Sequence, residues 1–177
     1  MTLLDALGSP RSLTLPDGGA VSVRPLERSD RAELAAAIAR LSDESRYFRF
    51  AAAKPRMTER ELDHLVDVDH HGHEALLASD PRTGGGIAVA RYVPIPGEPG
   101  VVELAVTVAD EWQGRGLGSA LLSRLIARAV EEGHTALRAS TLAANARSIA
   151  MLRRAGFRIL PSAGALRDYE LPLASGA

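Results

Sequence analysis

Two amino acids are absent or nearly so, and each absence excludes a kind of chemistry. The sequence contains no cysteine, which excludes disulfide bonds, thiolate zinc sites and a cysteine nucleophile. Lysine occurs only at Lys54. The remaining basic residues are arginines, which stay protonated and form no Schiff base at ordinary pH. Any covalent catalysis would therefore have to use a residue type other than cysteine.

The chain also lacks an excess of charge of either sign. Its 21 basic and 22 acidic residues leave a net charge of -1. Such a chain has little surplus positive charge with which to bind a nucleic-acid backbone or an anionic membrane. We therefore expect neither nucleic acid nor membrane among its partners.

Long apolar runs and targeting signals are missing too. No window approaches the roughly 18 uncharged apolar residues that a membrane span needs. Near the start, Asp5, Pro10 and Arg11 interrupt the apolar residues, which is unlike the long apolar stretch of a signal peptide. These absences predict a cytoplasmic protein.

The length of 177 residues fits one domain, because domains commonly contain roughly 100 to 200 residues. Hydrophobic residues make up 46% and charged residues 24% of the chain, as in ordinary globular proteins. We predict a single domain over residues 1–177. Residues 1–18 are expected to form a loose leader that ends in a turn at 16–19.

The hydrophobic periodicity predicts mixed secondary structure. Period-2 alternation predicts a strand over residues 20–25, helical spacing predicts a helix through residues 34–41, and Thr58 with Glu61 forms a capping box for another helix. Further strands are expected over residues 74–79, 86–93, 101–108, 135–140, 157–160 and 168–173, and further helices over 116–132 and 145–155. An antiparallel meander followed by an alternating half is typical of an α+β fold with helices on the faces of its sheet.

Two polar segments have more than one interpretation. Residues 45–50 interleave arginine with aromatic residues, which suits base stacking, but two arginines in a neutral chain are weak evidence for RNA binding. Residues 67–73 contain three histidines and two aspartates, which are ligand types for several divalent metals. They lack the fixed spacing of a helical metal motif, so we expect a polar loop and no metal.

The most informative segment is Gln-Gly-Arg-Gly-Leu-Gly at residues 113–118, which joins a predicted strand to a strongly periodic helix. Glycines let the backbone approach a ligand closely, and the unpaired amides of a helix start attract phosphate. With the charge of Arg115, the segment is interpreted as a pyrophosphate cradle. It matches neither the Walker motif, which needs a lysine, nor the spacing of the dinucleotide fingerprint. A tight turn without a ligand is the alternative.

This segment resembles the coenzyme-A-binding motif Q/R-x-x-G-x-G/A of the GNAT superfamily of N-acetyltransferases, with Gln113, Gly116 and Gly118 at the three specified positions. Residues 145–157 resemble the family's helix that ends in Gly-Phe and packs beside the coenzyme. Together with the order of the upstream elements, the resemblance covers most of the chain.

A finer resemblance links the chain to the acetyltransferase domain of bacterial protein lysine acetyltransferases. It is carried by residues 45–50, by 68–69 with 73–78, and by Glu103. It implies that the histidine-containing segment is a connection between a helix and a strand. It also implies an amine as the acceptor of the acetyl group, with a protein lysine as one possibility and a small molecule as the other.

The resemblance implies a GNAT-like fold, in which about four helices flank a mostly antiparallel sheet of six to seven strands. A splayed strand pair would bind coenzyme A, with acetyl-CoA as the cosubstrate and no metal. The residues implied to contact the coenzyme are Val106, Thr107, Val108, Gln113, Gly114, Arg115, Gly116, Leu117, Gly118 and Asn145. Asn145 also stands where a helix cap is expected.

Glu103 is the candidate general base. Alternation along the strand places Val102 and Leu104 on one face, so Glu103, Ala105 and Thr107 share the other. Among apolar neighbours an acid has a raised pKa, which suits a base acting near neutral pH. The alternative is that this face meets solvent and Glu103 is an ordinary surface charge.

The general acid has no clear candidate. Many GNAT enzymes have a tyrosine four residues before the glycine of Gly-Phe, and Leu152 occupies that position here. Ser148 and Tyr169 are possible substitutes, and a thiolate can also leave unaided. The leading prediction is acetyl transfer by direct attack in a ternary complex. The alternative is a coenzyme-A-binding module without turnover, and the oligomeric state, including a homodimer, is left open.

Overall fold

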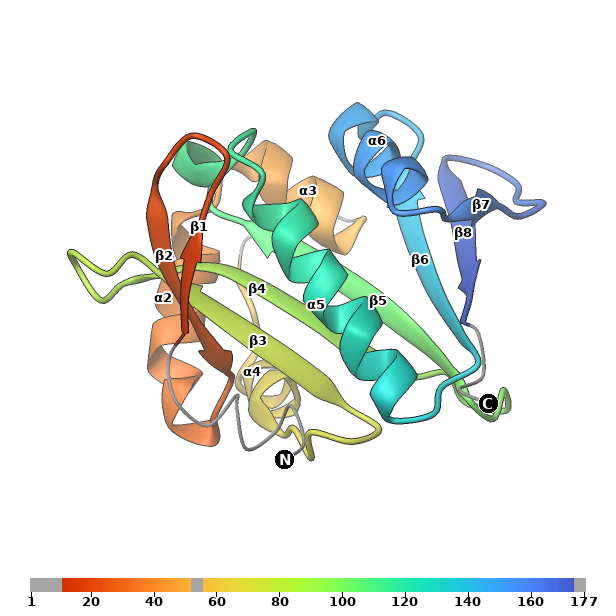
Figure 1. Ribbon diagram of the computed structural model, residues 1–177, viewed down its shortest axis with the longest axis horizontal. Helices are drawn as coiled ribbons and strands as arrows, with labels where there is room; N and C mark the ends of the chain where they lie inside the picture. Colours follow the sequence, from red (N-terminus) through yellow and green to blue (C-terminus); the bar gives the residue numbers. More distant parts are fainter. Residues whose placement is uncertain (1–10, 52–55, 174–177) are drawn as a thin grey trace.

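The computed structural model describes residues 11–51 and 56–173. In this part of the chain one eight-stranded sheet has the order β1-β2-β3-β4-β5-β6-β8-β7, and every neighbouring pair is antiparallel except β5 and β6 (Figure 1). The strands are β1 (Arg11–Thr14), β2 (Ala20–Pro25), β3 (Glu74–Ser79), β4 (Gly86–Pro94), β5 (Val101–Val108), β6 (Ala136–Leu142), β7 (Arg158–Ile159) and β8 (Leu166–Pro172).

Helices cover both faces of the sheet. The α-helices are α2 (Arg31–Arg40), α3 (Asp43–Phe50), α4 (Glu59–Val66), α5 (Leu117–Glu131) and α6 (Ala146–Arg154), with short 3-10 turns η1 (Arg28–Asp30) and η2 (Asp110–Trp112). One core cluster joins α5 and α6 to the sheet, and a second lies between the sheet and α2 and α4. Among these helices, none is long and apolar enough to cross a membrane.

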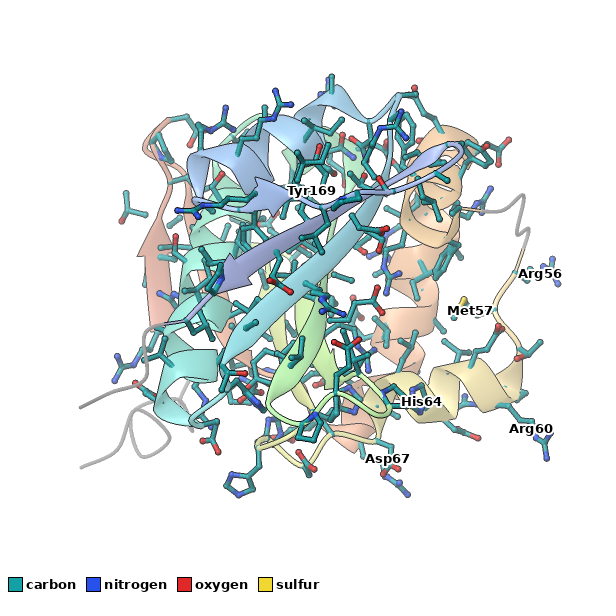
Figure 2. The ribbon with its side chains drawn as sticks, turned by 90° about the vertical axis from the view of Figure 1, so that its right-hand side faces the viewer. Arg56, Met57, Arg60, His64, Asp67 and Tyr169 are labelled. Atoms are coloured by element: carbon teal, nitrogen blue, oxygen red, sulfur yellow. The ribbon has the colours of Figure 1, made fainter. Side chains whose placement is uncertain are left out.

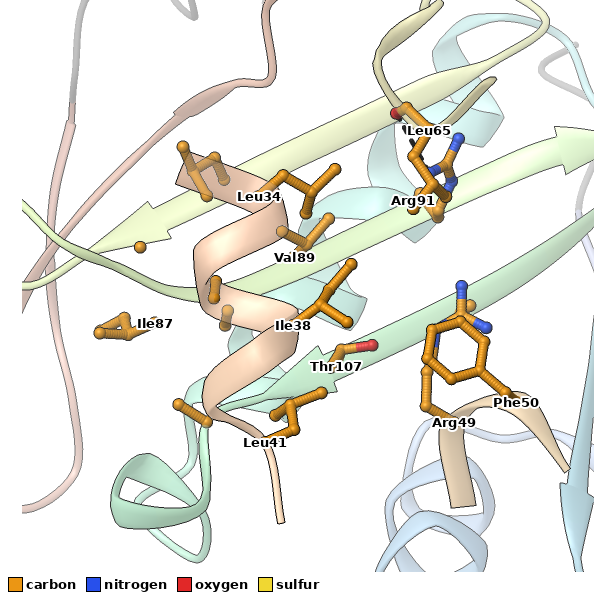
Figure 3. A pocket seen from close by; sticks show the side chains of 16 residues that line it. Leu34, Ile38, Leu41, Arg49, Phe50, Leu65, Ile87, Val89, Arg91 and Thr107 are labelled. Atoms are coloured by element: carbon orange, nitrogen blue, oxygen red, sulfur yellow. Dashed lines mark hydrogen bonds between the residues drawn. The ribbon is translucent and has the colours of Figure 1, made fainter. Parts of the chain in front are cut away.

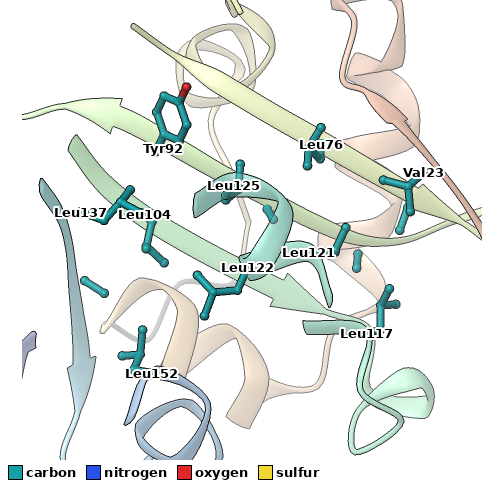
Figure 4. Packing of buried hydrophobic residues seen from close by; sticks show 14 of the residues in the cluster. Val23, Leu76, Tyr92, Leu104, Leu117, Leu121, Leu122, Leu125, Leu137 and Leu152 are labelled. Atoms are coloured by element: carbon teal, nitrogen blue, oxygen red, sulfur yellow. The ribbon is translucent and has the colours of Figure 1, made fainter. Parts of the chain in front are cut away.

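Helix α5 forms because its apolar residues recur on one side. Leu117, Leu121, Leu122 and Leu125 are each at most 1% exposed and pack against Leu76, Tyr92 and Leu104 of the sheet (Figure 4). Burying a leucine side chain stabilises the fold by roughly 1.5 to 3 kcal/mol. This packing fixes the position of the glycine-rich turn that precedes α5.

The parallel pair separates along its length. Strands β5 and β6 are paired only from Val101–Ala136 to Glu103–Arg138, and the remaining residues of β5 have no pairing with β6. In Figure 1 β6 diverges from β5 beside α6. The predicted splayed strand pair is therefore confirmed, and it leaves one backbone edge of β5 open.

Two numerical expectations for the fold are corrected. The sheet has eight strands rather than six to seven because β1 forms where residues 1–18 were expected to be a loose leader: Leu13 pairs with Val21, and Leu15 is 2% exposed. Residues 1–10 and Lys54 lie outside the described part of the chain.

There are five α-helices in the described residues rather than about four. The additional helix is α3, which spans the arginine and aromatic segment, and its start is capped by Ser42, whose hydroxyl accepts a hydrogen bond from the Ser45 amide. The capping box of Thr58 and Glu61 at the start of α4 is confirmed.

Candidate active site

A groove of about 1110 Å³ opens where β5 and β6 separate. Its walls come from α3, from residues 103–108 of β5, from the turn before α5, from residues 139–142 of β6 and from α6. The groove therefore collects residues that are far apart in the sequence, and it contains most of the predicted site.

The glycine-rich turn provides the backbone geometry that the sequence predicted. Gly114 and Gly116 have φ angles of 75° and 88°, in the left-handed region that favours glycine. Gly116 is the N-cap of α5. The first amides of a helix lack acceptors within the helix, and Gly116 and Gly118 of this turn line the groove.

Gly118 meets a second requirement, which is close packing. A Cβ atom at this position would lie 3.3 Å from Sδ of Met151 and 3.6 Å from Cγ2 of Val108. The residue thus lies where α5, α6 and β5 approach one another. An alanine here would press on the walls of the groove.

Gln113 connects three walls of the groove. Its Nε2 donates to Oγ of Ser45 at 3.0 Å and to the Val108 carbonyl at 3.1 Å, while its Oε1 accepts from Arg147 at 2.6 Å. The side chain thereby holds α3, the end of β5 and α6 together. Arg147 also lines the groove, and this cation was not among the predicted site residues, although it lies in the second motif block.

The side chains of Arg115 and Leu117 point away from the groove, as the predicted buried face of the helix requires for Leu117. The Arg115 Nε donates to Oδ2 of Asp17 at 2.5 Å, and its guanidinium lies 4.2 Å from the centroid of the Trp112 ring. Leu117 is 1% exposed in the core. Neither side chain lines the groove, and the guanidinium of Arg115 pairs with Asp17 in this structure, so their contact with the coenzyme stays a prediction.

The end of β5 presents an unpaired edge to the groove. Val106, Thr107 and Val108 all line it, and the pairing with β6 ends three residues earlier, at Glu103. Backbone N–H and C=O groups on such an edge need partners. This edge suits an extended ligand with amide groups, as the pantetheine arm is.

Glu103 lies at the point where β5 and β6 separate, and it lines the groove. Its face assignment is confirmed: Val102 and Leu104 are buried in the core, whereas Ala105 and Thr107 line the pockets on the other face. The expected burial is wrong, because Glu103 is exposed. Strand β6 turns away from β5 beyond this residue, so apolar neighbours do not enclose the Glu103 side chain.

The predicted residues on and near α6 have different roles: some cap the helix, some line the groove and some lie in the core. The Asn145 side chain accepts a hydrogen bond from the Ser148 amide at 3.1 Å, which confirms the predicted cap, and both residues line the groove. Leu152 is 2% exposed and belongs to the core, although it also lines the groove. Tyr169 on β8 is 1% exposed and does not line the groove, which leaves Ser148 as the only one of the two proposed substitute acids that reaches it (Figure 2).

The histidine segment disperses its side chains among different partners. The Nδ1 of His70 lies 2.7 Å from Oε1 of Glu74, and the Nδ1 of His71 lies 3.0 Å from Oε2 of Glu132. His73 contacts the Arg91 guanidinium. Burial, reinforced by the charge of Arg91, lowers the pKa of His73 to about 4. The segment is the polar loop that the sequence predicted.

A smaller apolar pocket adjoins the groove, and no motif in the sequence indicates it. It lies between α2, α3 and the sheet, where Ile38, Leu65 and Val89 line it (Figure 3). Arg49 and Arg91 line both this pocket and the groove. These two arginines come from α3 and β4 and show no shared motif in the sequence, so only the folded chain reveals that they lie at one site.

In this structure a parallel strand pair separates beside a glycine-rich helix start, and a groove lies between the separated strands. Acyltransferases that use coenzyme A have this organisation. The sequence model of the Acetyltransferase (GNAT) family matches residues 37–157. The chain therefore belongs to the GNAT acetyltransferase family.

Individual relatives agree with this assignment. The chain is 35% identical over 134 residues to Acetyltransferase PA5475 of Pseudomonas aeruginosa, covering 75% of this chain and 72% of that protein. It is 41% identical over 91 residues to the L-methionine sulfoximine/L-methionine sulfone acetyltransferase of the same species, covering 50% of this chain and 52% of that protein.

A solved structure extends the likeness over nearly the whole chain. The crystal structure of the GNAT domain of S. lividans PAT matches with a TM-score of 0.85 and 31% identity, covering 93% of this chain and 97% of that one. The predicted family, the α+β fold and the enzyme class are confirmed. The protein is an acetyltransferase with acetyl-CoA as its cosubstrate.

Proposed function

We propose that the protein transfers the acetyl group of acetyl-CoA to a primary amine by direct attack in a ternary complex, with Glu103 as the general base. The observation that carries the proposal is the continuity of one groove from the glycine-rich start of α5, past the open edge of β5, to the carboxylate of Glu103.

The residues present fit the coenzyme. The backbone amides of residues 114–118 would hold the pyrophosphate, since a helix start favours negative charge. The open edge at Val106, Thr107 and Val108 would pair with the amide groups of the pantetheine arm. Arg147 and Asn145 line the same groove, and in this proposal they contact the phosphates.

The remaining chemistry requires a base. When bound, acetyl-CoA supplies an activated thioester. An amine acceptor enters as an ammonium ion, which has no lone pair, so the Glu103 carboxylate removes its proton directly or through water. The free amine then forms a bond to the acetyl carbon as the C–S bond breaks, and its second proton passes to the departing thiolate or to solvent.

Substitution of Glu103 tests this role. We expect Glu103→Gln to lower kcat/KM for the amine at pH 7 by about 10²-fold, as for the loss of a general base, with unchanged affinity for acetyl-CoA. The loss should shrink as the pH rises, because more of the acceptor is already unprotonated. Thiol release measures turnover, and calorimetry measures coenzyme binding.

Glu111→Gln is the matched control, since Glu111 is exposed on η2 and does not line the groove. It should leave kcat/KM unchanged. Full turnover of Glu103→Gln at neutral pH, with normal binding of acetyl-CoA, would refute the assignment of Glu103 as the base.

A further inference from the structure

Arg49 presents a guanidinium group that has no acceptor among the described residues, and it lies at the junction of the groove and the apolar pocket. It lies in the last turn of α3, and its guanidinium carbon is 5.0 Å from the centroid of the Phe50 ring (Figure 3). Within residues 11–51 and 56–173, no side chain or carbonyl accepts a hydrogen bond from it and no carboxylate forms an ion pair with it. Its donors are therefore free to bind a ligand.

These donors reach open space. In the described part of the chain, every fully buried side-chain nitrogen or oxygen atom has a hydrogen-bond partner. Because Arg49 has none, its nitrogen atoms must be accessible from the groove or the pocket, both of which it lines. The Arg49 donors are thus not fully enclosed by protein atoms.

The environment of Arg49 is unfavourable for a cation without an anion. Burial lowers the pKa of Arg49, and the charge of Glu103 only partly opposes this effect. Arg91 lies close enough for the two positive charges to repel: burial and the charge of Arg49 lower the pKa of Arg91 to about 10. A bound anion would remove this cost.

Arg91 is less available to an anion than Arg49, because both of its terminal nitrogen atoms already have partners. Its Nη1 donates to the Leu65 carbonyl at 3.1 Å, and its Nη2 contacts His73. Arg91 instead adds positive charge beside Arg49. A guanidinium group binds a carboxylate through two parallel hydrogen bonds, and Arg49 is the group available to form them.

The charges around the site complement a zwitterion. Glu103 provides a negative charge for an ammonium group, Arg49 provides a positive charge for a carboxylate, and both line the groove. Between α2 and the sheet, Ile38, Leu65 and Val89 provide an apolar surface. A lysine side chain of a protein has an ammonium group but no carboxylate attached near it, so its binding would leave Arg49 without a partner.

We propose that Arg49 binds the carboxylate of the acceptor, and that the acceptor is a free α-amino acid with an aliphatic side chain. The apolar pocket, whose volume is about 40 Å³, receives the end of this side chain, and the rest of the side chain lies in the groove beside Arg49. This assignment rests on the proposed function, in which the amine of the acceptor attacks the acetyl group beside Glu103. The assignment extends that function by naming a specificity-determining residue and a class of substrate.

The test compares acids with their amides. L-Leucine and L-methionine are offered beside L-leucinamide and L-methioninamide, which keep the amine and the side chain but lack the carboxylate, and beside a neutral peptide containing lysine. We expect kcat/KM to favour each acid over its amide by at least about 10-fold, the effect of one charge-assisted hydrogen-bonded pair.

Arg49→Met keeps the aliphatic stem and removes the charge. It should raise KM for the acids by about 10- to 100-fold while leaving the amides and the KM for acetyl-CoA unchanged. Arg49→Lys should restore part of the preference. Arg46→Met is the matched control, because Arg46 lies on the same helix, pairs with Asp43 and lines neither pocket; it should change nothing.

Three results would overturn the proposal. The first is an equal efficiency for acids and amides in the unaltered protein, or a preference for the lysine peptide. The second is an equal loss for both substrate types in Arg49→Met, which would indicate a structural role. The third is a rise of the KM for acetyl-CoA in that variant, which would make Arg49 a contact of the coenzyme phosphates.

A binding measurement separates this proposal from the proposed function. Calorimetric titration of the protein saturated with coenzyme A should show L-leucine binding that Arg49→Met weakens, without any turnover. Such binding without acetylation would support the Arg49 site and contradict the catalytic proposal. Acetylation of amines without any preference for a carboxylate would support the catalytic proposal and contradict the Arg49 site.

Discussion

Two features require a glycine at position 116: the left-handed backbone conformation and the close approach of Pro16. Its φ angle of 88° lies in the left-handed region, and a Cβ atom would lie 2.9 Å from both Cδ and Cγ of Pro16. Pro16 belongs to the turn between β1 and β2, so this strand pair presses on the start of α5. The glycine is required by tertiary packing as well as by the ligand.

We therefore expect Gly116→Ala to weaken acetyl-CoA binding by about 10-fold or more. A left-handed alanine costs about 1 to 2 kcal/mol, and the clash with the proline ring must in addition shift the turn that we propose holds the phosphates. Calorimetric titration with acetyl-CoA measures the effect.

Gly133→Ala is a control for the backbone term alone. Gly133 has a φ angle of 77° and lies after the far end of α5, and among the described residues beyond its chain neighbours no atom lies within 4 Å of the position that a Cβ atom would take. In denaturant unfolding, Gly133→Ala should lower the free energy of unfolding by about the same 1 to 2 kcal/mol that a left-handed alanine costs. Its affinity for acetyl-CoA should not change. Equal affinity losses in the two variants would contradict the role given to the Gly116 turn.

At the scale of elements, helix α6 forms part of the groove wall, so the stability of this helix affects the shape of the groove. Asn145 caps the helix through the Ser148 amide, and Met151 on the following turn packs near Gly118. Arg147 on its first turn is held by Gln113. The cap therefore stabilises a helix whose other contacts shape the ligand site.

Removal of the cap should be measurable as stability. Asn145→Ala is expected to lower the free energy of unfolding by about 1 kcal/mol, the usual cost of a lost N-cap, as measured by denaturant unfolding followed by circular dichroism. Asn145→Ser retains a capping oxygen and should recover most of the lost free energy of unfolding. If both variants unfolded like the unaltered protein, the cap would contribute no stability.

At the scale of the whole molecule, a charged network joins the far end of α5 to the sheet. Arg128 and Glu74 are 2% and 1% exposed at their side chains, and Nε of Arg128 lies 3.2 Å from Oε2 of Glu74. Arg128 also donates to the His70 carbonyl at 2.8 Å. His70 in turn contacts the second oxygen of Glu74. Removing one member would leave a buried charge without its partner.

This network predicts a pH dependence of stability. The hydrogen bond to Glu74 raises the pKa of His70 above its ordinary value of 6.5, although burial opposes the effect. A raised folded-state pKa stabilises the fold fully below pH 6.5, and the contribution is lost as the pH rises through the folded-state value. His70→Gln should therefore destabilise the protein most below pH 6.5 and progressively less at higher pH.

The stability contribution of His73 changes with pH in the opposite direction to that of His70, so the two contributions must be measured separately. Because its folded-state pKa is lowered to about 4, its contribution is present above pH 6.5 and is lost as the pH falls toward 4. Denaturant unfolding of the unaltered protein and His70→Gln across pH 5 to 9 isolates the His70 part as a difference. A difference that does not vary with pH would refute the prediction.

The local elements follow from short-range sequence signals. Alternation along β5 assigned Glu103 and Val102 to opposite faces, helical spacing of leucines identified α5, and the capping box marked the start of α4. The spacing of Gln113, Gly116 and Gly118 identified the coenzyme turn and with it the family. Such features depend on residues within a few positions of one another, where periodicity and capping are read directly.

Features that depend on distant segments needed the folded chain. Strand β1 is short, and its place in the sheet depends on its pairing with β2. The Arg115 guanidinium went to Asp17, across 98 positions of sequence, rather than to the groove.

The sequence by itself determined the glycine turn, the amphipathic α5 and the side of β5 on which Glu103 lies, because these are set by backbone conformation and local periodicity. Only the tertiary structure decided that Glu103 is exposed, because β6 diverges from β5 just beyond it. It also decided that Arg49 and Arg91 share one pocket, because α3 and β4 meet only when the chain folds.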